Sequence, residues 1–153
     1  MKRVMKWAFV AAGVALLAGC AASGPKFAEM SSTIPQVKEG QGRVYFFRSS
    51  SMLGAAVQPE IRLNDQVVGK SQPGGFFYVD GAKGTYKAAA STETEKTLSF
   101  TLDAGETKYV REEVSMGVLV GRIVLTLESA EKALAELAKL HYTGGADDKV
   151  ARK

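Results

Sequence analysis

The spacing of hydrophobic positions changes three times along this chain of 153 residues. Residues 7–18 form an unbroken run of apolar or small side chains, and the next two dozen residues hold few large apolar groups. From residue 43 apolar positions occur in short, often alternating runs between turn residues, which indicates β-strands. After residue 129 they recur at helical spacing. The pattern therefore predicts a leader, a linker, a β-rich domain and a C-terminal helix.

The strands of the β-rich region differ in how many of their faces are expected to be covered. The run Val44–Phe47 is apolar at every position, as expected of a strand buried on both faces. Asn64 and Asp65 tolerate the left-handed conformation, so a hairpin turn is expected there. The strand at residues 107–112 has no assignable inward face. Two other strands alternate strictly, and their expected inward residues are Leu98, Phe100, Leu102, Ile123, Leu125 and Leu127.

The expected fold class is mainly β: an antiparallel β-sandwich of about seven or eight short strands with one C-terminal amphipathic helix. Ser129 is a suitable N-cap for this helix, and Gly144 and Gly145 are a suitable stop. The helix would pack across the sandwich or its end. The residues that share its expected inner face are Leu134, Leu137, Ala138 and His141.

The leader has the features of a lipoprotein signal peptide. Lys2, Arg3 and Lys6 precede the apolar run, which is too short to span a bilayer, where roughly 20 residues are needed. The run ends in a lipobox, and its cysteine is the only one in the chain. Its residues are Leu17, Ala18, Gly19 and Cys20.

The lipobox predicts that signal peptidase recognises residues 17–19, removes residues 1–19 and leaves Cys20 as the first residue. The Cys20 thiol would carry a diacylglyceryl group and its amino group an acyl chain such as palmitate, and two or more chains anchor a protein stably. Ala21 and Ala22 follow, with no aspartate to favour the inner membrane. We therefore expect the inner leaflet of the outer membrane, facing the periplasm. A plain secreted protein with a chance cysteine is the alternative.

Composition and turn residues divide the mature chain into three parts. Residues 20–42 contain glycine, proline and serine with few large apolar groups, so a lipidated N-terminus and flexible tether is expected. Residues 43–143 are expected to form the β-sandwich domain with its helix. Residues 144–153 are expected to be a disordered tail.

Charge and cysteine content exclude several kinds of function. Three of the 20 basic residues lie in the leader, which leaves 17 against 16 acidic residues. A near-neutral protein lacks the basic stripe that nucleic-acid binding needs. With Cys20 acylated, no thiol remains for a disulfide, a metal or a nucleophile. His141 is the sole histidine, so we expect no metal and no cofactor, and an interaction of His141 with a helix end.

The remaining candidate residues do not form a catalytic set. Residues 64–71 resemble a phosphate-binding loop, but Pro73 and the glycines after it prevent the helix that such a loop requires. Glu112 and Glu113 are neighbours in a strand and should point to opposite faces. Glu93 and Glu95 lie in a turn rich in threonine and serine and are expected to be solvated. The chain is therefore not expected to be an enzyme.

Two segments between strands are apolar where loops are usually polar. They span residues 51–57 and 115–121. If exposed at one end of the domain, they would form a hydrophobic patch suited to a partner or to lipid. The alternative is that they extend strands or fold into the end of the sandwich. The candidate contact residues are Met52, Leu53, Val57, Met116, Val118 and Leu119.

Four segments carry a family resemblance: Gly42–Arg48, Ile61–Gly69, Gly75–Val79 and Gly84–Tyr86. Together they resemble the bacterial lipoprotein family known as domain of unknown function 2846. They resemble the PEGA type of small β-sandwich more loosely. The resemblance implies a secreted β-sandwich without an assigned activity, and it offers no site residues to carry over.

Two functions are compatible with these observations. The first is a non-enzymatic interaction or adaptor module of the cell envelope, which would present an edge strand or the apolar loops to another envelope protein. The alternative is a binding module for a glycan or small envelope ligand, which requires exposed aromatic side chains. The candidates for such a platform are Tyr45, Phe76, Phe77, Tyr78, Tyr86 and Tyr109.

Overall fold

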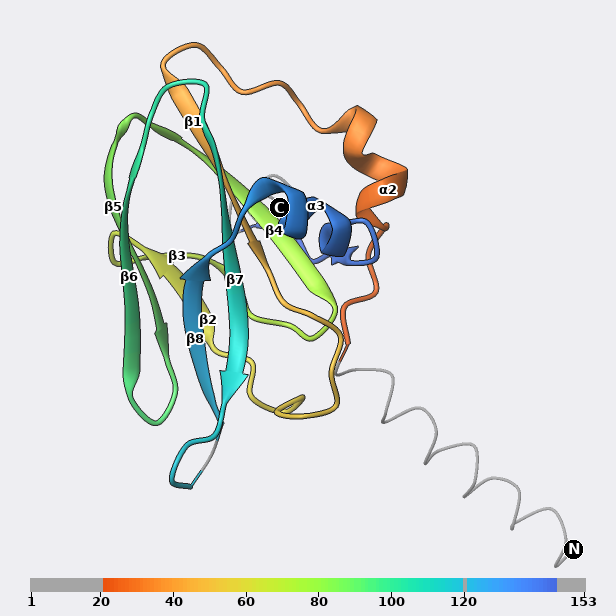
Figure 1. Cartoon of the computed structure of the whole chain (residues 1–153), viewed down its shortest axis with the longest axis vertical. Coiled ribbons are helices and arrows are strands. Elements are labelled where there is room, and N and C mark those ends of the chain that lie inside the picture. Colours follow the sequence, from red (N-terminus) through yellow and green to blue (C-terminus); the bar gives the residue numbers. More distant parts are fainter. Residues whose placement is uncertain (1–20, 120, 146–153) are drawn as a thin grey trace, which may run out of the picture.

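Two β-sheets packed face to face form the body of the protein, and short helices cover the outer side of one sheet (Figure 1). The computed structural model describes residues 21–119 and 121–145. The lipobox residues 17–20 and the tail residues 146–153 lie outside the described residues. The elements are α2 (Phe27–Met30), the 3-10 helix η1 (Ser31–Thr33), β1 (Gln41–Phe47), β2 (Glu60–Leu63), β3 (Gln66–Lys70), β4 (Gly75–Ala82), β5 (Gly84–Ser91), β6 (Glu95–Leu102), β7 (Thr107–Ser115), β8 (Arg122–Leu127), α3 (Ala130–Leu137) and β9 (His141–Tyr142).

The strand order confirms the expected mainly β sandwich with one C-terminal helix. Sheet A has five strands in the order β8-β7-β1-β4-β9, and sheet B has four in the order β3-β2-β5-β6. Two pairs in sheet A are parallel, β1 with β7 and β4 with β9. The other strand pairs of the described residues are antiparallel. The sandwich is therefore not antiparallel throughout, because segments far apart in sequence meet in sheet A.

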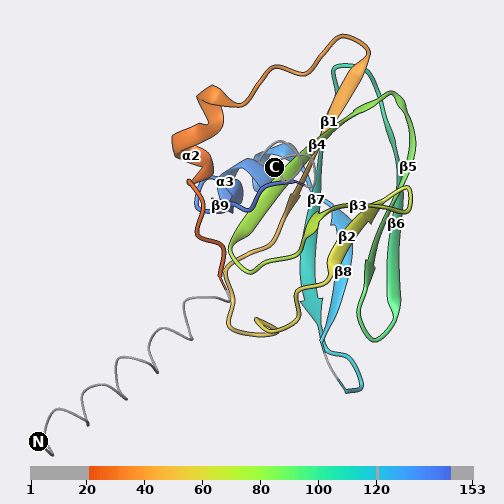
Figure 2. The same ribbon diagram turned by 180° about the vertical axis from the view of Figure 1, so that it is seen from behind.

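Strand β1 lies at the centre of sheet A and is covered on both faces, as its uninterrupted apolar run predicted. Val44 and Phe46 belong to the core between the sheets. Tyr45 and Phe47 face the other way, into a second core shared with α3 and the N-terminal segment. Figure 2 shows α3 and α2 together on that side of sheet A. Since alternate residues of a strand point to opposite faces, a strand in the middle of three layers must be apolar throughout.

The core between the sheets follows the predicted alternation at most positions. Phe100, Leu102, Ile123 and Leu125 are buried. Leu127 was expected to face inward as well, but its side chain is 46% exposed. It is the last residue of β8, which is the edge strand of sheet A.

Helix α3 begins as predicted but ends earlier. The Ser129 hydroxyl accepts a hydrogen bond from the Lys132 N–H. Ala133 and Leu137 form the buried face, whereas Leu134 and Ala138 are exposed, so that part of the predicted face is wrong.

The predicted continuation of the helix to residue 143 is also wrong. His141 and Tyr142 form β9 and pair with the free edge of β4. The edge of β4 next to the end of α3 provides hydrogen-bond partners for this segment, because the His141 N–H donates to the Gly74 carbonyl and the Thr143 N–H to the Phe76 carbonyl, each at 2.9 Å. His141 therefore does not lie at a helix end, and its Nδ1 lies 2.6 Å from the Gly24 carbonyl oxygen.

The N-terminal segment lies against sheet A, which corrects the prediction of a flexible tether over residues 20–42. The Ala22 N–H donates to the Pro73 carbonyl at 3.1 Å, and the Phe27 N–H donates to the Leu140 carbonyl at 2.9 Å. The Phe27 ring packs edge-on against Tyr45 at 5.9 Å. The aromatic outer face of sheet A needs apolar cover, and this segment provides it.

Three apolar residues of this segment, Phe27, Met30 and Ile34, pack on the second core. Their spacing of three and four residues is that of one helical face. Further along, Arg43 forms a bidentate ion pair with Asp80 and donates to the Pro35 carbonyl at 2.8 Å. Residues 22–35 are therefore held to the domain. None of the helices among the described residues has the length and apolar character that crossing a bilayer requires.

The docking of the N-terminal segment predicts that Phe27→Ala lowers the free energy of unfolding by about 2 kcal/mol, less than for a fully buried phenylalanine. Urea titration measures this change. Gln36→Ala, at an exposed position of the same segment, is the matched control and should have no effect. Equal stability of the two variants would show that the segment is a free tether after all.

Candidate functional site

Five large apolar side chains are exposed on the two loops that the sequence singled out. Their exposed fractions are 85% for Met52, 59% for Leu53, 75% for Met116, 83% for Val118 and 88% for Leu119. We call these five residues the apolar end. Val57, the sixth candidate, is half-buried and packs against the core between the sheets.

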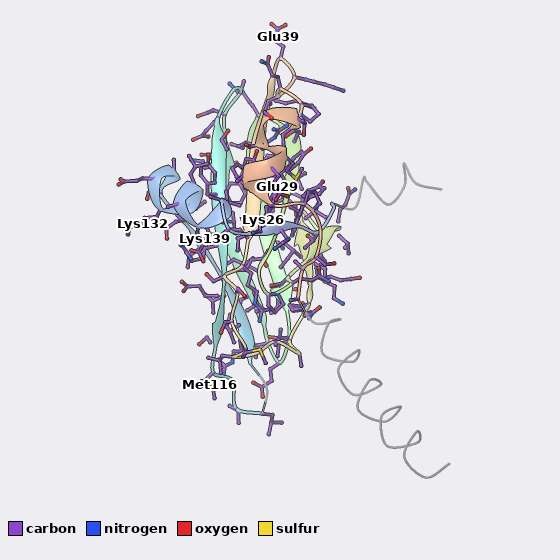
Figure 3. All side chains as sticks on the ribbon, turned by 90° about the vertical axis from the view of Figure 1, so that its right-hand side faces the viewer. Lys26, Glu29, Glu39, Met116, Lys132 and Lys139 are labelled. Carbon is purple, nitrogen blue, oxygen red and sulfur yellow. The ribbon has the colours of Figure 1, made fainter. Side chains whose placement is uncertain are left out.

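The two loops meet at the last residues of β7. A Cβ atom on Gly54 would lie 2.6 Å from Val114 Cγ1, and one on Gly121 would lie 3.3 Å from the same atom. Gly54 also has a positive φ of 65°, so this close approach suits glycine alone. Figure 3 shows Met116 at one end of the molecule and Glu39 at the other. The apolar loops therefore share one end of the sandwich and are exposed there.

The first loop is held from inside by Arg48, whose side chain is only 2% exposed. One guanidinium nitrogen donates to the Val57 carbonyl at 2.6 Å, and the other donates to the Gly54 carbonyl at 2.8 Å. A weaker contact of 3.5 Å reaches the Ser71 carbonyl. Arg48 thus links the connection from β1 to β2 with the connection from β3 to β4.

The second loop is held by Glu93, from the turn between β5 and β6. Its carboxylate accepts hydrogen bonds from the Val118 N–H at 2.9 Å and the Leu119 N–H at 2.6 Å. It also lies 3.7 Å from Arg122 Nε. The expectation that Glu93 is solvated is therefore wrong, whereas Glu95 remains exposed and pairs with Arg62. A charged side chain fixes the backbone of each apolar loop.

A buried carboxyl group, Glu112, lies beside Arg48. The parallel register pairs Phe47 with Arg111, and its continuation places Arg48 next to Glu112. Burial raises the pKa of the Glu112 carboxyl from 4.5 to about 7, against the opposing effects of the Ser71 hydroxyl and the Arg48 charge. Burial also lowers the pKa of Arg48, which the Glu112 charge opposes.

Hydrogen bonding around this buried group is incomplete. Arg48 Nε, Ser71 Oγ and Glu112 Oε1 have no hydrogen-bond partner of good geometry among the described residues. They lie near a hollow of about 240 Å³, whose lining includes Arg48, Glu112 and Leu53. Glu113 points to the opposite face and is exposed, as the alternation predicted. One sign of this cluster is visible in the sequence, because Arg48 continues the alternation of the inward positions Val44 and Phe46.

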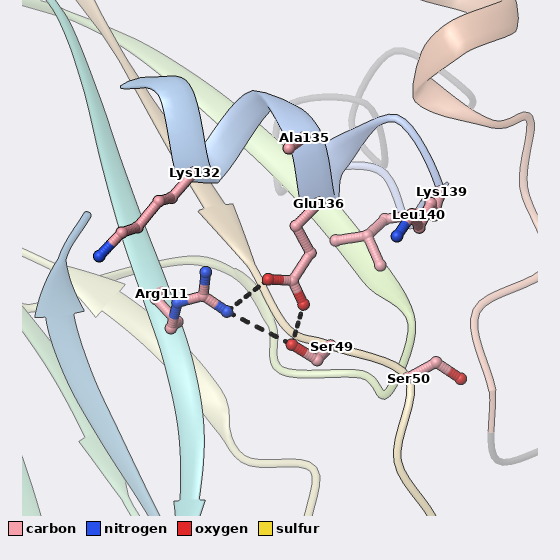
Figure 4. A pocket seen from close by; sticks show the side chains of 8 residues that line it. All are labelled: Ser49, Ser50, Arg111, Lys132, Ala135, Glu136, Lys139 and Leu140. Atoms are coloured by element: carbon pink, nitrogen blue, oxygen red, sulfur yellow. Dashed lines mark hydrogen bonds and ion pairs between the residues drawn. The ribbon is translucent and has the colours of Figure 1, made fainter. Parts of the chain in front are cut away.

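A second hollow, of about 540 Å³, lies between the end of β1, β7 and α3 (Figure 4). Arg111 donates to Glu136 at 2.5 Å and to Glu128 at 3.1 Å, and the Ser49 hydroxyl also binds Glu136. Lys132 and Lys139 line its rim. The Glu136 carboxylate is already paired with Arg111, so it is poorly placed to take a proton from Ser49. This network fastens α3 to sheet A.

The aromatic residues do not form the platform that a glycan-binding module would need. Tyr45, Phe76 and Phe77 are buried. Tyr78, Tyr86 and Tyr109 are half-buried, and each stacks or packs on another ring.

The segment that resembles a phosphate-binding loop forms the hairpin β2–β3, as expected. Asn64 and Asp65 have positive φ values of 48° and 66°, the pattern of the tight hairpin turn with two left-handed residues. Among the described residues no group of three histidine, cysteine, aspartate or glutamate side chains is arranged to hold a metal ion.

The fold and the site define a two-sheet β-sandwich with an apolar end, whose loop backbone is hydrogen-bonded to charged side chains. The chain belongs to the family described as "Protein of unknown function (DUF2846)", which matches residues 38–123. This range includes both apolar loops together with Arg48, Glu93 and Glu112, and it confirms the family resemblance seen in the sequence. The lipoprotein character and the likeness to the PEGA type of sandwich stay predictions.

A relative is found in Haemophilus influenzae (strain ATCC 51907 / DSM 11121 / KW20 / Rd). This "Uncharacterized protein" is 29% identical over 134 residues, which cover 84% of this chain and 79% of the relative. No solved structure matches the chain.

The contacts of Arg48 predict that Arg48→Met lowers the free energy of unfolding by about 3 kcal/mol, because buried carbonyl groups and Glu112 lose their partner. Arg62→Met is the matched control, since Arg62 pairs with Glu95 at the surface and should contribute less than about 1 kcal/mol. Urea titration of both variants measures the difference. Equal losses would show that Arg48 does not hold the loop.

The raised pKa of Glu112 predicts how stability depends on pH. Between pH 4.5 and 7 the unfolded chain releases the Glu112 proton while the folded protein keeps it. This group therefore lowers the free energy of unfolding as the pH rises through that window, by up to about 3 kcal/mol. Thermal unfolding of the protein and of Glu112→Gln from pH 4 to 8 isolates the effect. The difference in unfolding temperature between the two proteins should be smallest at low pH, where the Glu112 carboxyl is neutral. A difference that is the same at every pH would contradict the raised pKa.

Proposed function

We propose that the protein is a non-enzymatic lipoprotein of the cell envelope that acts by contact through its apolar end. The leader and lipobox support attachment by acyl chains on Cys20. The absence of an aspartate after Cys20 favours the inner leaflet of the outer membrane, with the domain in the periplasm.

The observation that carries this proposal is the exposure of five large apolar side chains at one end of the sandwich. Arg48 and Glu93 hold the backbone of the two loops, so the surface is organised before anything binds. A preorganised surface loses less conformational entropy on binding than a mobile loop does. Exposed apolar groups of this size, gathered at one place, are typical of contact surfaces.

The polar sites support a structural role better than a catalytic one. Arg111 is paired with both Glu128 and Glu136, and Glu112 is buried beside Arg48. A nucleophile next to a free base is the arrangement that hydrolytic chemistry needs, and Ser49 binds a carboxylate that is already neutralised. The sequestered aromatic rings weaken the alternative of a glycan-binding module.

The proposed anchor predicts that Cys20→Ser abolishes acylation. Cells grown with radiolabelled palmitate should label the native protein and the control Ser23→Ala, but not Cys20→Ser. Unchanged labelling of Cys20→Ser would contradict the anchor, and labelling absent from all three proteins would do the same.

The proposed contact predicts that a thiol introduced at the apolar end reacts more slowly in isolated envelopes than a thiol introduced elsewhere on the surface. Lipidation consumes the thiol of Cys20, so a cysteine introduced by Leu119→Cys or by the control Leu134→Cys is unique. Leu119 is 88% exposed in the protein and Leu134 only 42%, so an uncovered apolar end would react faster with a water-soluble maleimide. We expect the thiol at position 119 to react several-fold more slowly than the thiol at position 134. Faster reaction at position 119 would show that nothing covers the apolar end.

A further inference from the structure

The N-terminal segment is fastened to the domain almost up to the proposed site of lipidation. The Ala22 N–H donates to the Pro73 carbonyl at 3.1 Å, and a Cβ on Gly75 would lie 3.1 Å from Ala22 Cβ. Cys20 is two residues before Ala22, a span of at most about 7 Å. A lipid on Cys20 would therefore hold this part of the domain directly at the bilayer surface.

The apolar end lies next to this point of attachment. The Gly74 N–H, in the turn that receives Ala22, donates to the Ser49 carbonyl at 3.3 Å. Ser49 opens the loop that carries Met52 and Leu53, and that loop contacts the end of β7 through Gly54. Figure 1 shows the start of the described chain beside the β1–β2 loop, in the half of the molecule that also carries the β7–β8 loop.

The two loops carry no charge that would have to leave water. Residues 49–59 and 115–121 contain no aspartate, glutamate, lysine or arginine. Two charged groups that contact the loops, Arg48 and Glu93, bind the loop backbone. The exposed Glu60 and Glu113 belong to the adjoining strands. An apolar surface of this kind can enter the interfacial region of a bilayer without desolvating an ion.

Much of the loop backbone is hydrogen-bonded within the protein, which favours contact with acyl chains because the hydrocarbon region of a bilayer offers no hydrogen bonds. The Leu53 N–H binds the Ser51 hydroxyl. The Val57 N–H binds the Gly54 carbonyl at 2.9 Å, and the Gly54 and Val57 carbonyls accept from Arg48. The Val118 and Leu119 N–H groups donate to Glu93.

We propose that the apolar end rests in the interfacial region of the bilayer that carries the Cys20 lipid, so that the sandwich stands directly on the membrane. This inference rests on the proposed function, since it requires both the lipid on Cys20 and a contact made by the apolar end. The opposite end, where the Lys83 N–H binds the Gly40 carbonyl and Glu39 is exposed, then faces the periplasm.

Fluorescence quenching by lipid tests the inference in a system without other proteins. The full lipidated protein, with Leu53→Cys, Leu119→Cys or the control Lys83→Cys, is labelled with an environment-sensitive dye. Each is reconstituted in vesicles of phosphatidylethanolamine and phosphatidylglycerol that include a lipid with a nitroxide on its acyl chain. Quenching at positions 53 and 119 should exceed quenching at position 83 several-fold.

Two other results would overturn the inference in distinguishable ways. Equal, weak quenching at all three positions, together with a protected thiol at position 119 in envelopes, would mean that another protein covers the apolar end. The proposed contact function would then stand. A protein that is not acylated and does not bind the vesicles would remove both the inference and the proposed anchor. Circular dichroism of each labelled variant confirms that it is folded.

Discussion

The buried guanidinium of Arg48 joins two of the chain segments that cross between the sheets. It binds carbonyl groups of the β1–β2 connection at Gly54 and Val57, and it approaches the β3–β4 connection at Ser71. A buried cation needs such partners, and the carbonyls need a donor. The end of the sandwich and the shape of the first apolar loop depend on this side chain, and its charge partly offsets the rise that burial causes in the pKa of Glu112.

At this end of the molecule charged side chains lie inside and apolar side chains lie outside, the reverse of the usual arrangement. Arg48, Glu93 and Glu112 lie inside or beneath the loops, while Leu53 and Leu119 point outward. Such an arrangement is unfavourable in water, but it suits a surface that meets an apolar neighbour. The docked N-terminal segment brings the proposed lipid to the same end, so the apolar loops would face the membrane that carries the lipid. Membrane anchor and apolar loops would then act as one surface.

Local sequence patterns were sufficient to predict the elements that are held by local rules. Short apolar runs between turn residues located the strands, and alternation predicted most of the buried residues of β6 and β8. The uninterrupted apolar run of β1 predicted its place between two layers. The N-cap of α3 and the Asn64–Asp65 hairpin follow from single-residue preferences. The pairing of β1 with β7 and of β4 with β9 could not be predicted, because it joins segments distant in sequence. For the same reason the cover that Phe27 gives to sheet A, and the meeting of Arg48 with Glu112, were missed.

Amide hydrogen exchange tests most directly whether internal charges hold the apolar end in shape. The measurement is made on the purified protein before any membrane is added, at the backbone amides of Val57, Val118 and Leu119. Intramolecular hydrogen bonds predict exchange many-fold slower than in an unstructured peptide of the same sequence. Exchange at the rate of the unstructured peptide at all three positions would contradict the account.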